Sequence, residues 1–480
     1  MHIFNIIGAG AGGLATAARL AQEGYAVKVI ERHGYVGGRC SIISQNGYNS
    51  ALTKGHHSKR KLDLLKCESN CCIWFPDCDM VELSTDLSQL KREIQRYEGE
   101  GSFPRPCAFL EEAGRYYHLC SAYVLHKSFP SIFSVLRILR PLMQMRPWSN
   151  VYGCASRYFR SEKFRRVLAF ASMYMGMNPY QAPGTYTIVR YSETVDGIWY
   201  PRGGFSSTIA DIATRLGVEY QFDTPVEKDV RLATGEELYA DVTVVNADLV
   251  YAHRKFLPPS SRASSLSRCE TSCSSISFFW AFNEVLPNLR PHNIFLAKDY
   301  KESFDAIFDK HSIPDDPSFY VNVPSRVDPT AAPPSKEAIV VLVPVGSLTD
   351  STRDTTDSTY WHNAIKQVKR HVLETIEHRT GMKDLGFKIV HERIETPLTW
   401  QEKYNLDCCA ILGLSHSFSN VLSFRPKNKH PSISNLYFVG ASTHPGTGVP
   451  ICLAGAKRVA TEILDDHRTS KLTSILEQVI

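Results

Sequence analysis

The chain has 480 residues, of which 43% are hydrophobic and 21% are charged. These proportions are ordinary for soluble globular proteins and exclude disordered, collagen-like and small disulfide-rich chains. The 54 basic and 49 acidic residues leave a net charge of +5, which is too small for this length to indicate a nucleic-acid partner. No uncharged apolar run reaches 18 residues, so we predict no transmembrane span.

The 13 cysteines are scattered and odd in number, which disfavours a disulfide framework. The N-terminus also lacks the basic segment and cleavage site of a secretory signal. We therefore expect the protein at the cytoplasmic face of a membrane or in the cytoplasm. A cluster of four cysteines has neither Cys-x-x-Cys spacing nor a second matching pair, so we expect no metal site. The cluster comprises Cys67, Cys71, Cys72 and Cys78.

The N-terminus is typical of a strand, a glycine turn, a helix and a second strand, in that order. Residues 3–7 form a short apolar run, as a buried parallel strand does, and residues 26–30 form another that ends at Glu31. The turn between them fits G-x-G-x-x-G and precedes alanines and a leucine at helical spacing. It contains Gly8, Gly10, Gly12 and Gly13.

Each part of this pattern suits a dinucleotide pyrophosphate. Gly8 permits a tight turn, Gly10 lets the backbone approach the phosphates, and Gly13 lets the helix and strand pack closely. The helix N-terminus offers free N–H groups and the positive end of its dipole. Glu31, 18 residues after Gly13, is suited to accept hydrogen bonds from a ribose diol. The complete context favours a nucleotide site over a structural glycine turn.

A second glycine turn follows at once and narrows the choice of nucleotide. Arg32 begins an R-x-G-x-x-G-G-R element that ends at Gly38 and Arg39. The element resembles that of glutathione-reductase-like flavoproteins, which implies FAD rather than NAD. Arg39 is then a candidate for contact with the pyrophosphate or flavin region, the alternative being a solvated surface arginine.

The segment 121–150 combines apolar residues with basic ones, and no acidic residue interrupts it. An apolar stripe with basic flanks and Trp148 is typical of a segment in a membrane interface. The alternative is a core helix whose basic side chains reach solvent. Pro130 and Pro141 divide the segment into short pieces.

Later segments supply the rest of the expected architecture. Residues 170–179 are rich in methionine and aromatic residues, which suits either a long apolar ligand or ordinary core packing. A Pro-Arg-Gly-Gly turn at 201–204 precedes a helix predicted over 206–216. The expected strands are 217–222, which leads into Val226, then 241–248, which ends at polar residues, 276–282 and 338–345. A helix is expected over 358–380.

The C-terminal part contains a third glycine-rich turn. A strand is predicted at 436–439 and a helix at 451–463, with Gly440, Gly448 and Val449 between them. Backbone N–H groups of such a turn can bind a flavin or its pyrophosphate. A purely structural glycine loop is the alternative.

Together these motifs resemble the bacterial and fungal type of phytoene desaturase, a family of carotenoid-forming flavoenzymes in the amine-oxidase-like superfamily. The matching segments run from end to end in the family's order. They are 8–13, 34–39, 170–179, 182–186, 197–205, 246–248, 413–416, 424–426 and 437–450.

The resemblance implies an α/β fold with a discontinuous, glutathione-reductase-like FAD-binding Rossmann domain, a β-sheet substrate domain and a helical cap. We assign 1–82, 197–270 and 426–480 to the FAD domain, 83–196 to the cap and 271–425 to the substrate domain. The implied activity is FAD-dependent introduction of C=C bonds into a long apolar isoprenoid such as phytoene, with a quinone or oxygen as electron acceptor.

The resemblance and the motifs together give the candidate site residues. Because a flavin carries the difficult step, no metal or catalytic triad is required, and Arg202 and His444 are the polar candidates for catalysis. The cofactor-binding candidates are Gly8, Gly10, Gly12, Gly13, Glu31, Arg32, Gly38, Arg39, Val226, Gly440, Gly448 and Val449.

Departures from the family pattern keep alternatives open. After Gly47, basic and polar residues 50–60 replace the Phe-Asp-x-Gly-Pro-Ser-like segment of the family, and the C-terminus stops soon after the last helix. Residues 407–409, Asp-Cys-Cys, replace a small, basic and glycine-containing stretch. One alternative is a flavin oxidase or saturase acting on another lipid-like or secondary metabolite. The other is a catalytically impaired relative that binds a prenyl-like ligand or a partner.

Overall fold

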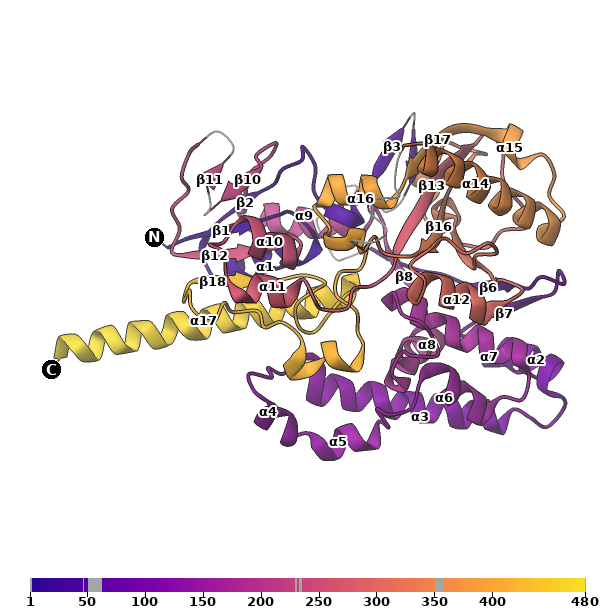
Figure 1. The fold of residues 1–480 in the computed structure, drawn as a ribbon, viewed down its shortest axis with the longest axis horizontal. Coiled ribbons are helices and arrows are strands. Elements are labelled where there is room, and N and C mark those ends of the chain that lie inside the picture. The colour runs from indigo at the N-terminus through magenta and orange to yellow at the C-terminus, as the bar shows by residue number, and fades with distance from the viewer. Residues whose placement is uncertain are drawn as a thin grey trace.

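The computed structural model describes residues 2–45, 47–50, 63–228, 231–232, 235–349 and 358–479. Within these ranges the chain forms two large sheets and a group of helices (Figure 1). The first sheet is parallel and five-stranded, in the order β18-β12-β1-β2-β9. Its strands are β1 Ile3–Ile7, β2 Ala26–Ile30, β9 Glu219–Gln221, β12 Val242–Val245 and β18 Leu436–Phe438.

Helices α1 (Ala11–Gln22), α9 (Phe205–Arg215) and α17 (Val449–Val479) complete this domain, and α1 packs against both of the others. Side chains from the sheet and these helices share one core, including the fully buried Leu14 and Val459. The predicted nucleotide-binding fold thus comes from three separated parts of the chain. The C-terminal half of α17 projects beyond the domain in Figure 1.

The second sheet has seven strands in the order β17-β13-β16-β15-β14-β6-β7. It is antiparallel except for the parallel pair β14–β6. All nine residues of β13, which pairs with β17 on one side and β16 on the other, are buried. The strands are β6 Cys71–Trp74, β7 Met80–Leu83, β13 Ser274–Phe282, β14 His292–Phe295, β15 Phe319–Asn322, β16 Glu337–Val345 and β17 Ile389–Glu395.

Strand β6 and most of β7 fall inside the range 1–82 that was predicted for the FAD domain, yet they form the edge of the second sheet. The reason is a long-range pairing, because Ile73 of β6 lies opposite Ile294 of β14. The first FAD-domain segment therefore ends before β6.

Helices cover both faces of the second sheet. One face packs against α14 (Ser358–Thr380), with Trp280 and Val372 in the same core. The other face packs against α12 (Tyr300–Phe308) and the helical cap. The cap comprises α2 Leu87–Glu98, α3 Pro104–Cys120, α4 Ile132–Leu136, α5 Leu139–Gln144, α6 Val151–Tyr158, α7 Glu162–Ala169 and α8 Thr187–Val195.

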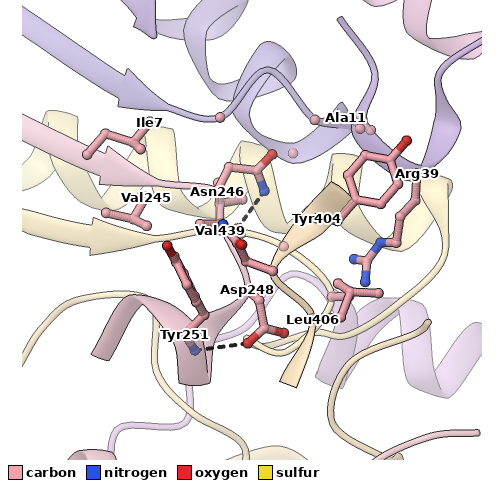
Figure 2. Close-up of a pocket in the computed structure, with 18 of the residues that line it drawn as sticks. Ile7, Ala11, Arg39, Val245, Asn246, Asp248, Tyr251, Tyr404, Leu406 and Val439 are labelled. Atoms are coloured by element: carbon pink, nitrogen blue, oxygen red, sulfur yellow. Dashed lines mark hydrogen bonds between the residues drawn. The ribbon is translucent and has the colours of Figure 1, made fainter. Parts of the chain in front are cut away.

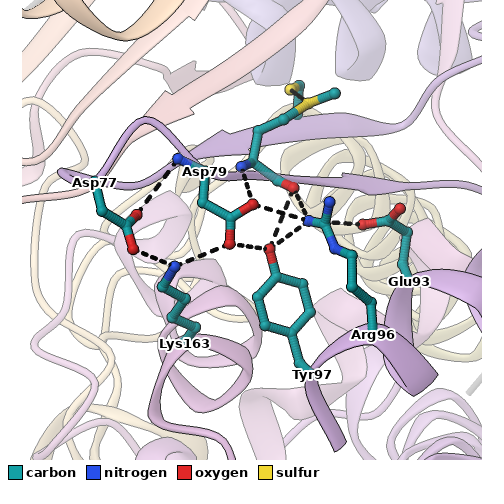
Figure 3. Close-up of polar contacts among 8 residues, drawn as sticks. Asp77, Asp79, Glu93, Arg96, Tyr97 and Lys163 are labelled. Atoms are coloured by element: carbon teal, nitrogen blue, oxygen red, sulfur yellow. Dashed lines mark hydrogen bonds and ion pairs between the residues drawn. The ribbon is translucent and has the colours of Figure 1, made fainter. Parts of the chain in front are cut away.

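A polar cluster joins the cap to the β6–β7 turn (Figure 3). Lys163 on α7 lies 2.5 Å from the Asp77 carboxylate and 2.9 Å from that of Asp79. From α2, the Tyr97 hydroxyl donates to Asp79 at 2.6 Å and the Arg96 guanidinium lies 3.2 Å from the same carboxylate. These groups are partly exposed, so the cluster lies at the surface, where it connects the edge of the cap to the second sheet.

The remaining strands form two-stranded sheets: β3 Ile43–Gln45 with β4 Tyr48–Ser50, β5 Leu64–Lys66 with β8 Trp199–Pro201, and β10 Val226–Lys228 with β11 Arg231–Leu232. Further α-helices are α10 Leu249–Lys255, α11 Ser261–Leu266, α15 Leu385–Lys388 and α16 Pro397–Tyr404. Among the described residues, no helix combines the length and apolar character needed to cross a bilayer.

Candidate cofactor site

A cavity of about 540 Å³ opens where the strands of the parallel sheet end (Figure 2). Ligands of open parallel sheets bind at the carboxyl ends of the strands, so the position suits a nucleotide. All the predicted cofactor-binding residues except Gly13 line this cavity. They are Gly8, Gly10, Gly12, Glu31, Arg32, Gly38, Arg39, Val226, Gly440, Gly448 and Val449.

In the first glycine turn the backbone segments pack closely, and the N-terminus of α1 stays open to the cavity. Gly8 has φ +99°, and α1 begins directly after Gly10. A Cβ on Gly13 would lie 2.2 Å from the carbonyl oxygen of Gly8, so this close contact between the helix and the turn requires a glycine. A phosphate-binding turn needs this combination of a tight bend and an accessible helix N-terminus.

Asn246, at the end of β12, joins three parts of the flavin domain. Its Oδ1 accepts a hydrogen bond from the N–H of Gly13 at 3.0 Å, and its Nδ2 donates to the carbonyl of Val439 at 2.7 Å. A Cβ on Gly10 would lie 2.6 Å from the same Oδ1. Asn246 lies in a segment that resembles the family but is not among the cofactor-binding residues predicted from the sequence.

Glu31 is 7% exposed at the end of β2 and lines the cavity. Its carboxylate accepts hydrogen bonds from the N–H groups of Ala9, at 2.7 Å, and His33, at 3.0 Å. A carboxylate has about four acceptor positions, so capacity remains for a ribose diol. The residues present therefore fit the nucleotide half of FAD.

A second carboxylate, Asp248, lies lower in the same wall. Burial raises its pKa to about 6, and the Asp407 carboxylate adds to this effect. Its Oδ1 accepts hydrogen bonds from the N–H groups of Val250 and Tyr251, so it also caps α10. Figure 2 shows the Asp248–Tyr251 hydrogen bond and, across the cavity, the Arg39 side chain.

The cavity ends among apolar side chains of the second sheet and its loops. Leu342 comes from β16, while Leu406, Ile411 and Leu412 come from the segment after α16. Tyr404 closes this side, and its hydroxyl lies 3.3 Å from that of Ser41. One continuous cavity therefore joins the nucleotide-binding sheet to the sheet expected to carry the substrate.

The structure places neither catalytic candidate in this cavity. Arg202 is 40% exposed, and its Nε lies 2.7 Å from the Asp63 carboxylate. His444 is buried against Phe129 and lines a separate cavity of about 70 Å³. Burial lowers the His444 pKa to about 3, so its ring is neutral. Neither residue is among those that line the cofactor cavity.

His416 is a buried residue whose role the sequence did not reveal. Its Nε2 accepts the N–H of Thr447 at 3.2 Å, and a Cβ on Gly446 would lie 2.0 Å from that nitrogen. Burial, and then the charge of Arg425, lowers its pKa well below the usual range. The neutral ring thus holds the third glycine turn against the cavity.

Three further features of the sequence can be compared with the structure. Phe170 and Met173 belong to the core between the cap and the second sheet, which favours the core-packing interpretation of 170–179. Within the described ranges, no group of three or more histidine, cysteine, aspartate or glutamate side chains is arranged to hold a metal ion. The altered segment 50–60 lies outside the described residues except for Ser50.

Comparisons with known proteins identify the class of this chain. A family model for flavin containing amine oxidoreductases matches residues 150–464, and a model for NAD(P)-binding Rossmann-like domains matches residues 6–58. Putrescine oxidase, solved with putrescine bound, shares the fold with a TM-score of 0.61 at 13% identity, over 97% of this chain and 99% of its own. The chain is a flavin-dependent oxidoreductase of the amine-oxidase fold, with FAD as its cofactor.

Sequence relatives define the family more narrowly. The phytoene desaturase of Fusarium fujikuroi is 46% identical over 96% of this chain and 89% of its own, and that of Neurospora crassa is 43% identical over 96% and 84%. The zeta-carotene-forming phytoene desaturase of Myxococcus xanthus is 33% identical over 96% and 93%. The chain belongs to the phytoene desaturase family, which confirms the resemblance.

The alignment with the Fusarium protein spans 507 positions, more than the 480 residues of this chain. That relative therefore has residues with no counterpart here.

Proposed function

We propose that this protein is an FAD-dependent desaturase that removes hydrogen from CH–CH bonds of a long apolar isoprenoid such as phytoene. The observation that supports it is the single cavity with two glycine turns and Glu31 at one end and Leu342, Ile411 and Leu412 at the other. A nucleotide end and an apolar end in one cavity suit a flavin enzyme with a hydrocarbon substrate.

The residues of the chain bind, orient and exclude water. We propose that the N-terminus of α1 binds the pyrophosphate, Glu31 the ribose, and Arg39 the phosphates or the flavin. FAD, when bound, supplies the hydride acceptor, and a proton leaves the neighbouring carbon of the substrate. The apolar end of the cavity keeps water from the reacting carbons. A quinone or oxygen would serve as the final electron acceptor.

The second part of the proposal is peripheral contact with a membrane through the cap. Large apolar side chains on and around α4 and α5 are exposed, because no other part of the described fold covers them. They are Tyr123 (43%), Ile132 (48%), Phe133 (72%), Leu136 (55%), Leu139 (47%), Met143 (51%) and Trp148 (67%). Arg137, Arg140 and Arg146 are exposed among them. Apolar side chains with cationic neighbours suit an anionic lipid surface, and phytoene, a hydrocarbon, would dissolve in the apolar interior beneath that surface.

Vesicle flotation tests the membrane contact. We expect the protein to float with anionic phospholipid vesicles, and Phe133→Glu combined with Leu136→Glu to reduce the bound fraction at least tenfold. Phe387→Glu is the matched control, because Phe387 is 94% exposed but lies on α15, away from the cap. Equal flotation of both variants would contradict the contact.

Expression in a bacterium that accumulates phytoene tests the activity. We expect coloured polyenes in the pigment extract, and no colour with Gly10→Val, because a side chain there meets Asn246 Oδ1 at 2.6 Å. Colourless cells with a soluble, FAD-loaded protein would exclude desaturation and favour the oxidase or saturase alternative.

A further inference from the structure

Arg425 is a buried cation held by backbone carbonyl groups. The residue is 1% exposed. Its guanidinium donates five hydrogen bonds, to the carbonyl oxygens of Thr443 (3.1 Å), Ser415 (2.9 Å), Asn420 (2.9 Å), Leu414 (3.3 Å) and Ala441 (2.5 Å). These acceptors belong to two segments, 414–420 and 441–443, which this one side chain connects.

A buried charge ordinarily has a counter-ion. Arg190 in the cap, also 1% exposed, follows this rule, because its Nη1 lies 2.8 Å from the Glu193 carboxylate. Among the described residues, no carboxylate forms an ion pair with Arg425. The ionisable groups that act on it are Tyr186, Cys452 and Cys269, which are neutral at pH 7. Burial lowers the Arg425 pKa to about 10, so it remains charged.

The uncompensated charge lies directly behind the wall of the cofactor cavity. Ala441 and Thr443, which accept two of the five hydrogen bonds, both line that cavity. Cys452 lines it as well, and the charges of Arg39 and Arg425 both oppose the rise that burial causes in its pKa. The field of Arg425 therefore reaches the space that the cofactor would fill.

We propose that Arg425 is a positioning residue that holds the 441–443 wall and whose charge favours reduction of the bound flavin. A hydride brings two electrons and one proton, so neutral oxidised flavin becomes a monoanion, while the substrate carbon loses that hydride. A fixed cation that needs no reorganisation stabilises such charge. This inference rests on the proposed cofactor site.

Reductive titration of the purified, FAD-loaded protein tests the charge, and it needs no substrate. We expect Arg425→Met to lower the ratio of reduced to oxidised flavin at fixed potential at least tenfold, a shift of about 30 mV for a two-electron couple. Arg425→Lys keeps the charge but loses the fork of five donors. We expect it to keep the wild-type potential and to release FAD about tenfold more readily.

Arg190→Met is the control, since it removes an equally buried arginine from the cap. It should lower thermal stability and leave the potential unchanged. Equal potentials in wild type and Arg425→Met would overturn the inference, as would the same shift in Arg190→Met. If Arg425→Met does not retain FAD, Arg425→Gln takes its place.

Loss of FAD from both neutral variants but not from Arg425→Lys would support the charge role. Loss from all three variants would overturn it. A wild-type chain that binds no FAD would instead refute the cofactor site itself.

Discussion

The N–H of Gly13 donates to Oδ1 of Asn246 at 3.0 Å, although 233 residues separate the two in sequence. This hydrogen bond attaches the first turn of α1 to the end of β12. The Asn246 Nδ2 simultaneously donates to Val439, which follows β18. One amide thus sets the spacing of the first and third glycine turns, which lie side by side in the wall of the cofactor cavity.

Asn246→Ala should therefore weaken FAD binding more than its effect on stability alone explains. We expect a loss of about 2 kcal/mol in unfolding free energy, because two partly buried hydrogen bonds disappear, and at least a tenfold rise in the FAD dissociation constant. Asn293→Ala is the control, since Asn293 is fully buried and hydrogen-bonded in the second sheet. It should lose similar stability, and unchanged FAD affinity in Asn246→Ala would refute the role.

Gly13→Ala should abolish FAD retention, because its Cβ would lie 2.2 Å from the Gly8 carbonyl oxygen and push the turn apart. The visible flavin absorbance per mole of purified protein measures the effect. Gly386→Ala is the matched change, since its Cβ would meet only Leu373 at an ordinary 3.5 Å. A yellow Gly13→Ala protein would be inconsistent with the tight turn.

Lys163→Met should loosen the cap at the β6–β7 turn. Lys163 contacts two carboxylates but is 31% exposed, so solvent screens the charges and we expect a loss of about 1 kcal/mol. Limited proteolysis should cut the cap sooner. Lys301→Met, which removes an exposed pair with Asp305 on α12, should change stability by less than half as much. Equal effects of both changes would show that the cluster does not hold the cap.

Stability should fall as the pH drops from 6.5 toward 4. Burial lowers the pKa of His253 to about 4 and of His444 to about 3, so below pH 6.5 the unfolded chain binds protons that the folded chain does not. Each histidine then lowers the free energy of unfolding by about 1.4 kcal/mol per pH unit, until the pH reaches the pKa of that histidine in the folded protein. His253→Phe should show a shallower decline in melting temperature between pH 7 and 5. Exposed His362→Gln should follow the wild type.

The glycine turns were predictable because each is a local pattern of strand, turn and helix within about 30 residues, as at Gly8–Glu31. The residues that join those patterns were not. Asn246, His416 and Arg425 act through partners in distant or separately folded segments, and nothing in their local sequence specifies which carbonyl or N–H they meet. The pairing of β6 with the second sheet was not predictable for the same reason, since its partner β14 lies far away in the sequence.

For the two catalytic candidates, closeness to a glycine-rich turn in the sequence did not predict where the side chain lies. Arg202 and His444 adjoin glycine-rich turns, yet one side chain turns outward to Asp63 and the other packs under Phe129. Backbone N–H groups and carbonyls form much of the cavity wall, so a search for reactive side chains finds little there.

The most direct test of the central claim is an anaerobic half-reaction. Purified protein loaded with FAD is mixed with phytoene in phospholipid vesicles, with oxygen and quinone withheld. We predict that the visible flavin absorbance bleaches, that one new double bond forms per flavin reduced, and that adding a quinone restores the oxidised spectrum. A flavin that stays oxidised in the presence of phytoene, while dithionite reduces it normally, would contradict the assignment of this protein as a phytoene desaturase.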